Sequence, residues 1–333
     1  MSTFERAFGE SSMAMVAEEF TAPVIVESRH RDGDDVLVLG LRHANGHSLP
    51  EWVPGAHIDL ILSPELTRQY SLCGDPKNRR VWTVAVLREP ASRGRGGSAY
   101  VHDVVEVGSR LQVRGPRNHF PLHAAKRYLF IAGGIGITPL LPMIDRVEAT
   151  GAQWHLVYGG RSLASMAFRS ELARYGERVS LLPQDETGLL DLERYLRSPV
   201  AETLIYCCGP EPLLDAVGER CGRWPVGSLH VERFAPKTPT TDAARPSFEV
   251  TLDKLGLTIT IPPDKSILEM LEDNGVNVLS SCRQGTCGTC ETRVLTGTPV
   301  HRDSVLSPAE QQSNEFMMVC VSRCLGDRLV LDL

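Results

Sequence analysis

Four cysteines near the end of the chain have the spacing of iron–sulfur ligands. Cys282, Cys287 and Cys290 follow the pattern Cys-x4-Cys-x2-Cys, and Cys320 follows Cys290 after 29 intervening residues. This is the ligand spacing of plant-type [2Fe–2S] clusters, and thiolates are soft ligands that suit iron. Glycines and small residues in the loop let backbone N–H groups turn toward the sulfurs, which stabilises the added negative charge on reduction. We therefore predict that these four cysteines hold a [2Fe–2S] cluster.

A structural zinc site is the alternative, but such sites usually have two close pairs of ligands, and a second close pair is missing here. Cys324 lies four residues after Cys320 and could be mistaken for a ligand. The spacing favours Cys320, so we expect Cys324 to be a buried thiol. The same expectation applies to the thiols of the remaining cysteines, Cys73, Cys207, Cys208 and Cys221.

Two segments in the first third of the chain suit a flavin. Arg68-Gln69-Tyr70-Ser71-Leu72 supplies a cation for a phosphate, an aromatic ring to lie against the flavin and a hydroxyl that could approach its N5 atom. Alone this match is weak, since such residues are common in structural strands. Arg95-Gly96-Gly97-Ser98 places glycines and a hydroxyl at the start of a short helical stretch, where N–H groups suit a phosphate. A mobile loop is the alternative here.

Two turns further along suit a dinucleotide. Gly133-Gly134-Ile135-Gly136-Ile137-Thr138-Pro139 follows a strand and opens a helix. It is not G-x-G-x-x-G, because Pro139 stands where the third glycine would be, but its glycines allow close approach to a pyrophosphate. Cys208-Gly209-Pro210-Glu211 is a second such turn after a later strand. An ordinary tight turn between strand and helix is the alternative for the segment Gly133–Pro139.

These motifs fall in regions of different secondary structure. Over the first ~120 residues, short apolar strands such as Val81–Leu87 alternate with turns, which is typical of a small antiparallel barrel. From about Lys126, strands alternate with helices, which predicts a parallel sheet. A proline-containing stretch predicts an extended linker before a third module. That module begins with a hairpin and a helix that Ser266 should cap and Gly275 should end.

Apart from about twenty N-terminal residues, the chain resembles the phthalate dioxygenase reductase family. The loop Ser280–Cys290, the segment Met318–Arg323 and the ending Leu329–Leu333 look like those of the family's ferredoxin domain. The resemblance implies a multidomain fold, with an antiparallel β-barrel that binds FMN, an α/β parallel-sheet domain that binds NAD and an α+β, β-grasp-like plant-type ferredoxin domain. We expect these at residues 1–122 (with 1–20 as an extension), 123–235 and 248–333, joined by a linker at 236–247.

The resemblance also implies roles for individual residues. The FMN contacts would come from Arg68, Gln69, Tyr70, Ser71, Ala85, Val86, Leu87, Arg95, Gly96, Gly97, Ser98, Thr138 and Phe234. The NAD contacts would come from Gly133, Gly134, Gly136, Arg161, Ser162, Cys208, Gly209 and Pro210. The catalytic residues would be Ser71, Thr138 and Cys208. They would position the nicotinamide for hydride transfer to the flavin rather than act as acids or bases.

The loop after the second strand of the parallel sheet bears on the choice of donor. Family members selective for NADH can have an acid there, which would hydrogen-bond the ribose hydroxyls. Here the loop is Gly159-Gly160-Arg161-Ser162-Leu163, with no acid before Glu171. We expect NADH as the donor, with NADPH accepted because Arg161 and Ser162 could tolerate a 2′-phosphate.

The resemblance implies that electrons pass from NADH through FMN and the cluster to a terminal oxygenase, which would be a Rieske-type aromatic oxygenase or demethylase. A reductase serving a cytochrome P450 uses the same three modules and is the second hypothesis. A non-catalytic electron carrier with a decayed flavin domain is the third, and the intact flavin and nucleotide segments oppose it.

Composition and charge limit the classes of partner and the cellular location that we expect. The net charge is −6, and residues from 248 onward have 12 acids against 7 bases, which argues against a nucleic-acid partner. No apolar run approaches the ~18 residues of a membrane span, and the start Met1–Arg6 lacks the apolar core of a signal peptide. We expect a cytoplasmic monomer with reduced cysteines.

Overall fold

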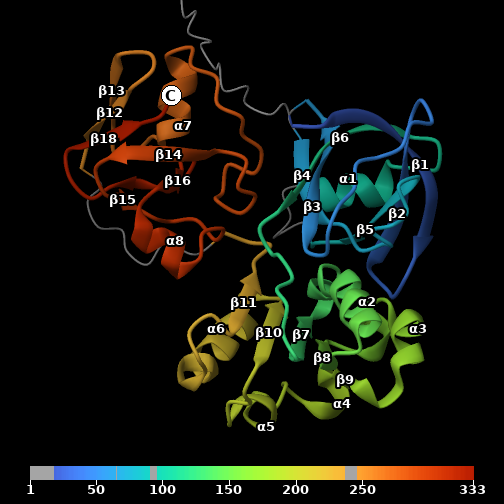
Figure 1. Ribbon diagram of the computed structural model, residues 1–333. Coiled ribbons are helices and arrows are strands. Elements are labelled where there is room, and N and C mark those ends of the chain that lie inside the picture. Colours follow the sequence, from blue (N-terminus) through green and yellow to red (C-terminus); the bar gives the residue numbers. More distant parts are fainter. Residues whose placement is uncertain (1–18, 65, 91–95, 237–245) are drawn as a thin grey trace, which may run out of the picture.

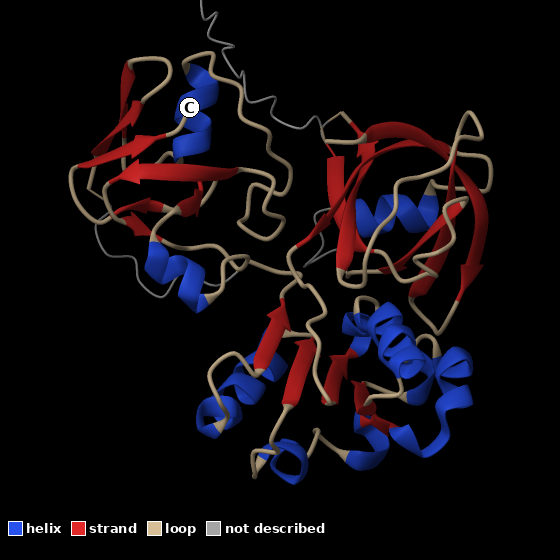
Figure 2. Ribbon diagram, in the orientation of Figure 1, coloured by secondary structure: helices blue, strands red, loops and turns tan. Residues whose placement is uncertain are grey.

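The computed structural model describes residues 19–64, 66–90, 96–236 and 246–333. Three larger sheets divide these residues into three modules, a barrel, a parallel-sheet module and a ferredoxin-like module (Figures 1 and 2). Arg95, most of the expected N-terminal extension and most of the expected linker lie outside the described residues. None of the helices in the described ranges has the length and hydropathy needed to cross a bilayer.

The first module is an antiparallel barrel with strand order β4-β3-β6-β1-β2-β5. Its elements are β1 (Thr21–Arg31), β2 (Val36–His43), β3 (Ala56–Ser63), β4 (Leu66–Ser71), β5 (Val81–Leu87), α1 (Gly97–Asp103) and β6 (Arg110–Asn118). The two edge strands meet through a bridge between Leu72 and Val84, and the Cys73 N–H donates to the Thr83 carbonyl at 2.9 Å. Alternate strand residues fill the interior, as the period of two requires. Val101 and Val105, in and after α1, complete this core.

The second module is a parallel sheet with strand order β11-β10-β7-β8-β9. Its strands are β7 (Arg127–Gly133), β8 (Gln153–Gly160), β9 (Val179–Pro183), β10 (Thr203–Cys208) and β11 (Leu229–Glu232). Its α-helices are α2 (Leu140–Thr150), α3 (Arg169–Leu172), α4 (Gln184–Thr187), α5 (Leu192–Leu196) and α6 (Glu211–Arg220). Its 3-10 helices are η1 (Gly134–Ile137), η2 (Leu163–Ser165), η3 (Ala173–Arg178) and η4 (Cys221–Arg223). Helices lie on both faces of the sheet, so most central residues of β7, β8 and β10 are apolar and buried.

The barrel and the parallel-sheet module share apolar packing. Val36 and Val38 of β2 and Ala85 of β5 belong to the same buried cluster as Phe130 and Tyr158 of the parallel sheet. On the polar side of this contact, Asp32 in the β1–β2 turn accepts from the Phe168 N–H at 3.1 Å. The two modules are therefore joined by a continuous core.

The third module is a mixed sheet with strand order β13-β12-β18-β14-β16, beside a small β15-β17 pair. Its elements are β12 (Phe248–Leu252), β13 (Leu257–Ile261), α7 (Ile267–Asp273), β14 (Glu291–Thr296), β15 (Pro299–Val300), α8 (Pro308–Ser313), β16 (Phe316–Met318), β17 (Arg323–Cys324) and β18 (Arg328–Leu331). Ser266 caps α7 in a capping box with Glu269, as predicted. This module has a separate hydrophobic core, because every residue of its buried cluster belongs to this module.

Candidate functional site

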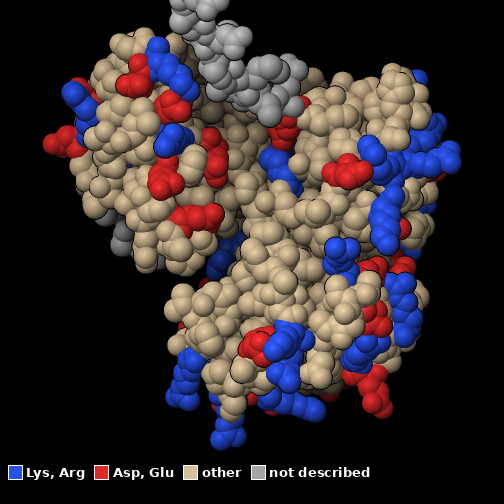
Figure 3. Space-filling view, viewed as in Figure 1, with Lys and Arg blue, Asp and Glu red and all other residues tan. Residues whose placement is uncertain are grey.

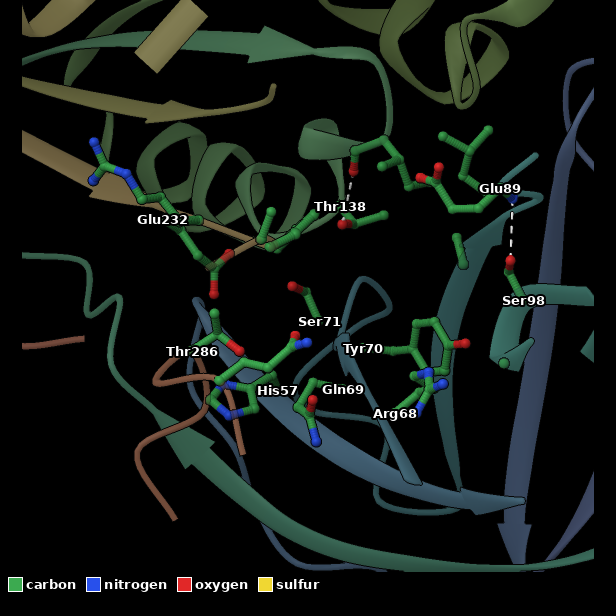
Figure 4. A pocket seen from close by; sticks show the side chains of 18 of the residues that line it. His57, Arg68, Gln69, Tyr70, Ser71, Glu89, Ser98, Thr138, Glu232 and Thr286 are labelled. Atoms are coloured by element: carbon green, nitrogen blue, oxygen red, sulfur yellow. Dashed lines mark hydrogen bonds between the residues drawn. The ribbon is translucent and has the colours of Figure 1, made fainter. Parts of the chain in front are cut away.

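A cavity of about 590 Å³ lies where the three modules meet, and Figure 4 shows side chains that line it. The barrel contributes residues of β4, β5 and α1. The parallel-sheet module contributes the turn after β7 and the segment from β11 onward, and the ferredoxin-like module contributes Gln284 and Thr286. Ten of the residues predicted to contact FMN line this cavity: Arg68, Gln69, Tyr70, Ser71, Ala85, Leu87, Gly97, Ser98, Thr138 and Phe234.

Two of the described FMN candidates do not line the cavity. Val86 lies between Ala85 and Leu87 on β5, so its side chain points into the barrel core, where it is 1% exposed. Gly96 precedes α1 with a φ of 79°, and a Cβ there would meet nothing within 4 Å.

One end of the cavity suits a phosphate. A Cβ at Gly97 would lie 2.5 Å from the Arg68 side chain, so glycine is what lets Arg68 lie against the start of α1. Ser98 is in the same place, and its hydroxyl accepts from the Glu89 N–H at 3.1 Å. The guanidinium and the hydroxyl fit the anionic end of FMN, and the apolar wall of Ala85 and Leu87 fits its ring.

The two glycine turns of the parallel-sheet module pack directly against each other. A Cβ at Gly136 would lie 2.2 Å from the Cys208 carbonyl oxygen, and one at Gly133 would lie 3.3 Å from the Gly209 Cα. The turns therefore stand side by side at the carboxyl ends of β7 and β10, where open parallel sheets bind their ligands. The predicted NAD contacts Gly134 and Pro210 belong to the same two turns.

The three predicted catalytic residues lie near a carboxyl group that was not predicted. Glu232, at the end of β11, hydrogen-bonds Ser71, and the Cys208 thiol lies 4.0 Å from its Oε2. Figure 4 shows Ser71 and Glu232 facing each other in the cavity, while the Thr138 hydroxyl donates to the Ile135 carbonyl at 3.0 Å. Burial raises the pKa of Glu232 to about 8, although the Ser71 hydrogen bond acts in the opposite direction. A carboxyl with such a raised pKa can hold a proton in the cavity at neutral pH.

This burial predicts a pH-dependent stability that Glu232→Gln should remove. Because the folded pKa lies above the unfolded value of about 4.3, the native state retains a proton that the unfolded chain releases, and stability falls as pH rises toward 8. Between pH 5.5 and pH 8.5, the cofactor-free Gln variant should lose less unfolding free energy than wild type, by at least about 1 kcal/mol, the equivalent of roughly one pKa unit. Urea unfolding at both pH values measures this. Equal losses in the two proteins would show that Glu232 titrates normally.

The four predicted cluster ligands come together where the loop of Cys282, Cys287 and Cys290 meets Cys320, just after β16. Cys282, Cys287, Cys290 and Cys320 are each at most 7% exposed. The thiols of Cys287 and Cys320 hydrogen-bond the Cys282 sulfur and hold its pKa below the usual range, and Cys320 also interacts with Cys290. By contrast, the Cys324 thiol lies 3.4 Å from the Arg328 carbonyl oxygen.

Backbone groups surround these sulfurs as a cluster would need. The N–H groups of Gln284 and Thr286 point at the Cys282 sulfur from 3.3 and 3.4 Å. Four thiols with backbone donors among them fit the [2Fe–2S] cluster that the cysteine spacing predicts.

The predicted donor-selecting residues lie apart from the cavity, at the carboxyl end of β8. Ser162 caps η2 and accepts from the Ser165 N–H at 3.3 Å. Arg161 is largely exposed, and its Nη2 atom lies 3.6 Å from the Asp35 carboxylate of the barrel. Its carbonyl also accepts from the Asp185 N–H. The structure thus brings two acids near a loop that has none in its own sequence.

The sequence did carry a signal for one missed part of the site. His57 and Asp59 alternate with apolar residues on β3, so both face the outside of the barrel, yet they are 6% and 0% exposed. Polar side chains at outward strand positions that are nevertheless buried must be covered by another part of the protein. His57 indeed lines the cavity. Glu232 carried no comparable signal, because its burial depends on the neighbouring module.

Comparison with known proteins agrees with this geometry. Residues 250–325 match the 2Fe-2S iron-sulfur cluster binding domain family, and residues 130–219 match the oxidoreductase NAD-binding domain family. Over 330 residues the chain is 41% identical to the phthalate 4,5-dioxygenase oxygenase reductase subunit of Pseudomonas putida, covering 97% of this chain and all of the relative.

Solved structures show the same architecture. Phthalate dioxygenase reductase, described as a modular structure for electron transfer from pyridine nucleotides to [2Fe–2S], superposes with a TM-score of 0.68 at 36% identity, covering 94% of this chain and 98% of that one. An intact type IV self-sufficient cytochrome P450 monooxygenase matches with a TM-score of 0.89 at 43% identity. The match covers 94% of this chain but only 41% of the P450 chain. The predicted multidomain fold is confirmed, and the chain belongs to the phthalate dioxygenase reductase family of oxygenase reductases.

Proposed function

We propose that this protein is the reductase component of an oxygenase system, with NADH, FMN and a [2Fe–2S] cluster as its cofactors. The observation that carries the proposal is the cavity walled by all three modules, with Gln284 and Thr286 of the cluster loop in its wall. Bound FMN would take two electrons from the nicotinamide and release them singly to the cluster.

The residues of the chain bind and orient these groups. Arg68, Gly97 and Ser98 would hold the phosphate end of FMN, and the turns around Gly136 and Cys208 would hold the nicotinamide nucleotide. Ser71 and Glu232 hold a proton at the junction of barrel and parallel sheet. Cys282, Cys287, Cys290 and Cys320 ligate the cluster. The three domains correspond to residues 1–122, 123–235 and 248–333.

The partner is a separate terminal oxygenase of the Rieske type, and the protein acts as a cytoplasmic monomer. A full-length relative at 41% identity is itself named as a reductase subunit of a dioxygenase. Residues 248–333 have 12 acids against 7 bases, and Figure 3 shows acidic side chains interspersed with basic ones on the visible face of this ferredoxin-like module. Its net negative charge suits a basic docking surface. A P450 partner is the second candidate, favoured by the match to a self-sufficient P450.

The proposal is tested first on the flavin and then on the partner. Purified protein should release about one FMN per chain on denaturation, as one cavity of this size holds one flavin. Finding FAD would contradict the single-phosphate end at Arg68. NADH consumption should then drive product formation when a Rieske-type oxygenase is added, and activity only with a P450 would select the second candidate.

Donor choice gives a separate prediction. Wild type should prefer NADH over NADPH by only roughly 10- to 100-fold, because the loop holds Arg161 and lacks a carboxylate. Ser162→Asp should sharpen the preference by repelling the 2′-phosphate. Asp can replace Ser162 as the cap of η2, so the fold should not suffer. The measurement is kcat/KM for both donors.

The matched control for this prediction is Ser162→Asn, which caps the same turn without charge. Its donor ratio should stay near that of wild type. A wild-type preference for NADPH would reject the prediction, and equal ratios for the Asp and Asn variants would place donor selection elsewhere.

A further inference from the structure

The barrel wall that faces the cluster loop contains a buried charged network centred on Asp59, which is itself not part of the cavity wall. We propose that Asp59, through Gln69 and Arg114, positions the cluster loop against the flavin cavity and so controls how fast electrons reach the cluster. This inference deepens the function proposed above and rests on it.

The network follows from strand register. Asp59 on β3 is paired with Gln69 on β4 and with Arg114 on β6. Side chains paired across neighbouring strands share one face of a sheet. The adjacent Ile58 and Leu60 fill the barrel core, so this row of three polar side chains stands on the outer face.

Asp59 is the centre of the row. Its Oδ1 accepts from Gln69 Nε2 at 2.8 Å, and its Oδ2 accepts from Arg114 Nε at 2.9 Å. Arg117 Nη2 lies 2.6 Å from Oδ1, and Glu19 forms ion pairs with both arginines. The carboxylate is therefore fully engaged, and it fixes the direction of the side chains around it.

Two of these side chains reach across to the ferredoxin-like module. Gln69 Nε2 donates to Ser281 Oγ at 2.7 Å, and Arg114 Nη2 donates to the Ser280 carbonyl at 2.9 Å. Ser280 and Ser281 immediately precede the cluster ligand Cys282. The network thus holds the chain at the point where it enters the cluster.

A second row holds the loop at its other end. His57 is paired with Arg117 on β6, and its ring hydrogen-bonds the Cys287 backbone. A Cβ at Gly288 would lie 2.1 Å from His119 Nε2, so this ring lies directly on the loop. The loop is therefore held on both sides of the segment that surrounds the sulfurs.

The same strand serves both redox groups. Gln69 holds the cluster loop, while its neighbours Arg68 and Tyr70 line the flavin cavity. The separation between flavin and cluster is then set by adjacent residues of β4. Buried ion networks stabilise a fold poorly, but in some proteins they select one arrangement over others, and one arrangement is what electron transfer needs.

The experiment uses the cofactor-loaded protein and the variants Asp59→Asn and Arg114→Gln. The control is Glu27→Gln, which removes an exposed ion pair with Arg42 elsewhere on the barrel. Anaerobic stopped-flow mixing with NADH should show flavin reduction within about twofold of wild type. Cluster reduction should slow roughly 10- to 100-fold, the cost of a misplacement of about 1 Å. Hydrogen exchange of residues 280–290 should rise in both variants and stay unchanged in the control.

Two further variants keep the inference testable if a buried substitution prevents folding. Ser281→Ala removes only the acceptor for Gln69, and Arg114→Lys keeps the charge but loses the forked donor. Both should slow cluster reduction severalfold. If variants that retain FMN and the cluster reduce the cluster at the wild-type rate and show wild-type hydrogen exchange of residues 280–290, the inference is overturned. A wild type whose cluster NADH does not reduce would instead overturn the proposed function.

Discussion

Cys320→Ser should remove most of the visible absorbance of the iron–sulfur cluster. The Cys320 thiol interacts with both Cys282 and Cys290, so its loss takes a ligand from one iron, and a serine hydroxyl is a poor replacement for a soft thiolate. The variant should still oxidise NADH with an acceptor that takes electrons from the flavin, because the cavity's phosphate end and glycine turns belong to other modules. Electron delivery to a cluster-dependent acceptor should be lost.

Cys324→Ser is the matched control. Cys324 is four residues away and equally buried, but its thiol lies at the Arg328 carbonyl. A serine hydroxyl can make the same hydrogen bond, so absorbance and electron delivery should persist. Equal loss of cluster in the two variants would mean that the fourth ligand is wrongly assigned.

Gly136→Ala should reduce kcat/KM for NADH about 100-fold, the effect of displacing binding groups by roughly 1 Å. The new Cβ would lie 2.2 Å from the Cys208 carbonyl oxygen. Because the clash is with backbone rather than a flexible side chain, one of the two glycine turns must move. Overpacking of this kind should also cost about 1–3 kcal/mol of stability. Steady-state kinetics and urea unfolding measure the two effects.

Gly218→Ala is the control in the same module. It adds the same methyl group on the exposed side of α6, where nothing lies within 4 Å. It should leave NADH kinetics unchanged and raise helix stability by about 0.5–1 kcal/mol. Wild-type kinetics for Gly136→Ala would show that the two turns are not rigidly packed.

The sequence predicted those parts of the molecule that depend on residues close together in the chain. Cysteine spacing, the capping box at Ser266 and the glycine turn after β7 each depend on nearby residues of the sequence. In the structure the cysteine sulfurs lie together, Ser266 caps α7, and the glycine turn follows β7. The fold class also followed, because strand and helix periods differ between the modules.

The parts that could not be predicted depend on contacts between modules. Glu232 is an ordinary strand residue until Ser71 of the barrel comes to lie beside it. Arg161 has no acid in its own loop, yet Asp35 of the barrel lies 3.6 Å away. Asp59 acquires its role only because the cluster loop covers it. A single sequence does not show which residues of such distant segments will contact each other.

The separate core of the ferredoxin-like module bears on how the chain unfolds and on how it can be recombined. The barrel and the parallel sheet share apolar packing, so they should melt together as one cooperative unit. The third module has its own core and meets the barrel through polar groups, the kind of contact that dissociates most readily between domains. It can therefore unfold, be exchanged for a related electron-transfer module, or be joined to another enzyme while the rest of the chain keeps its fold.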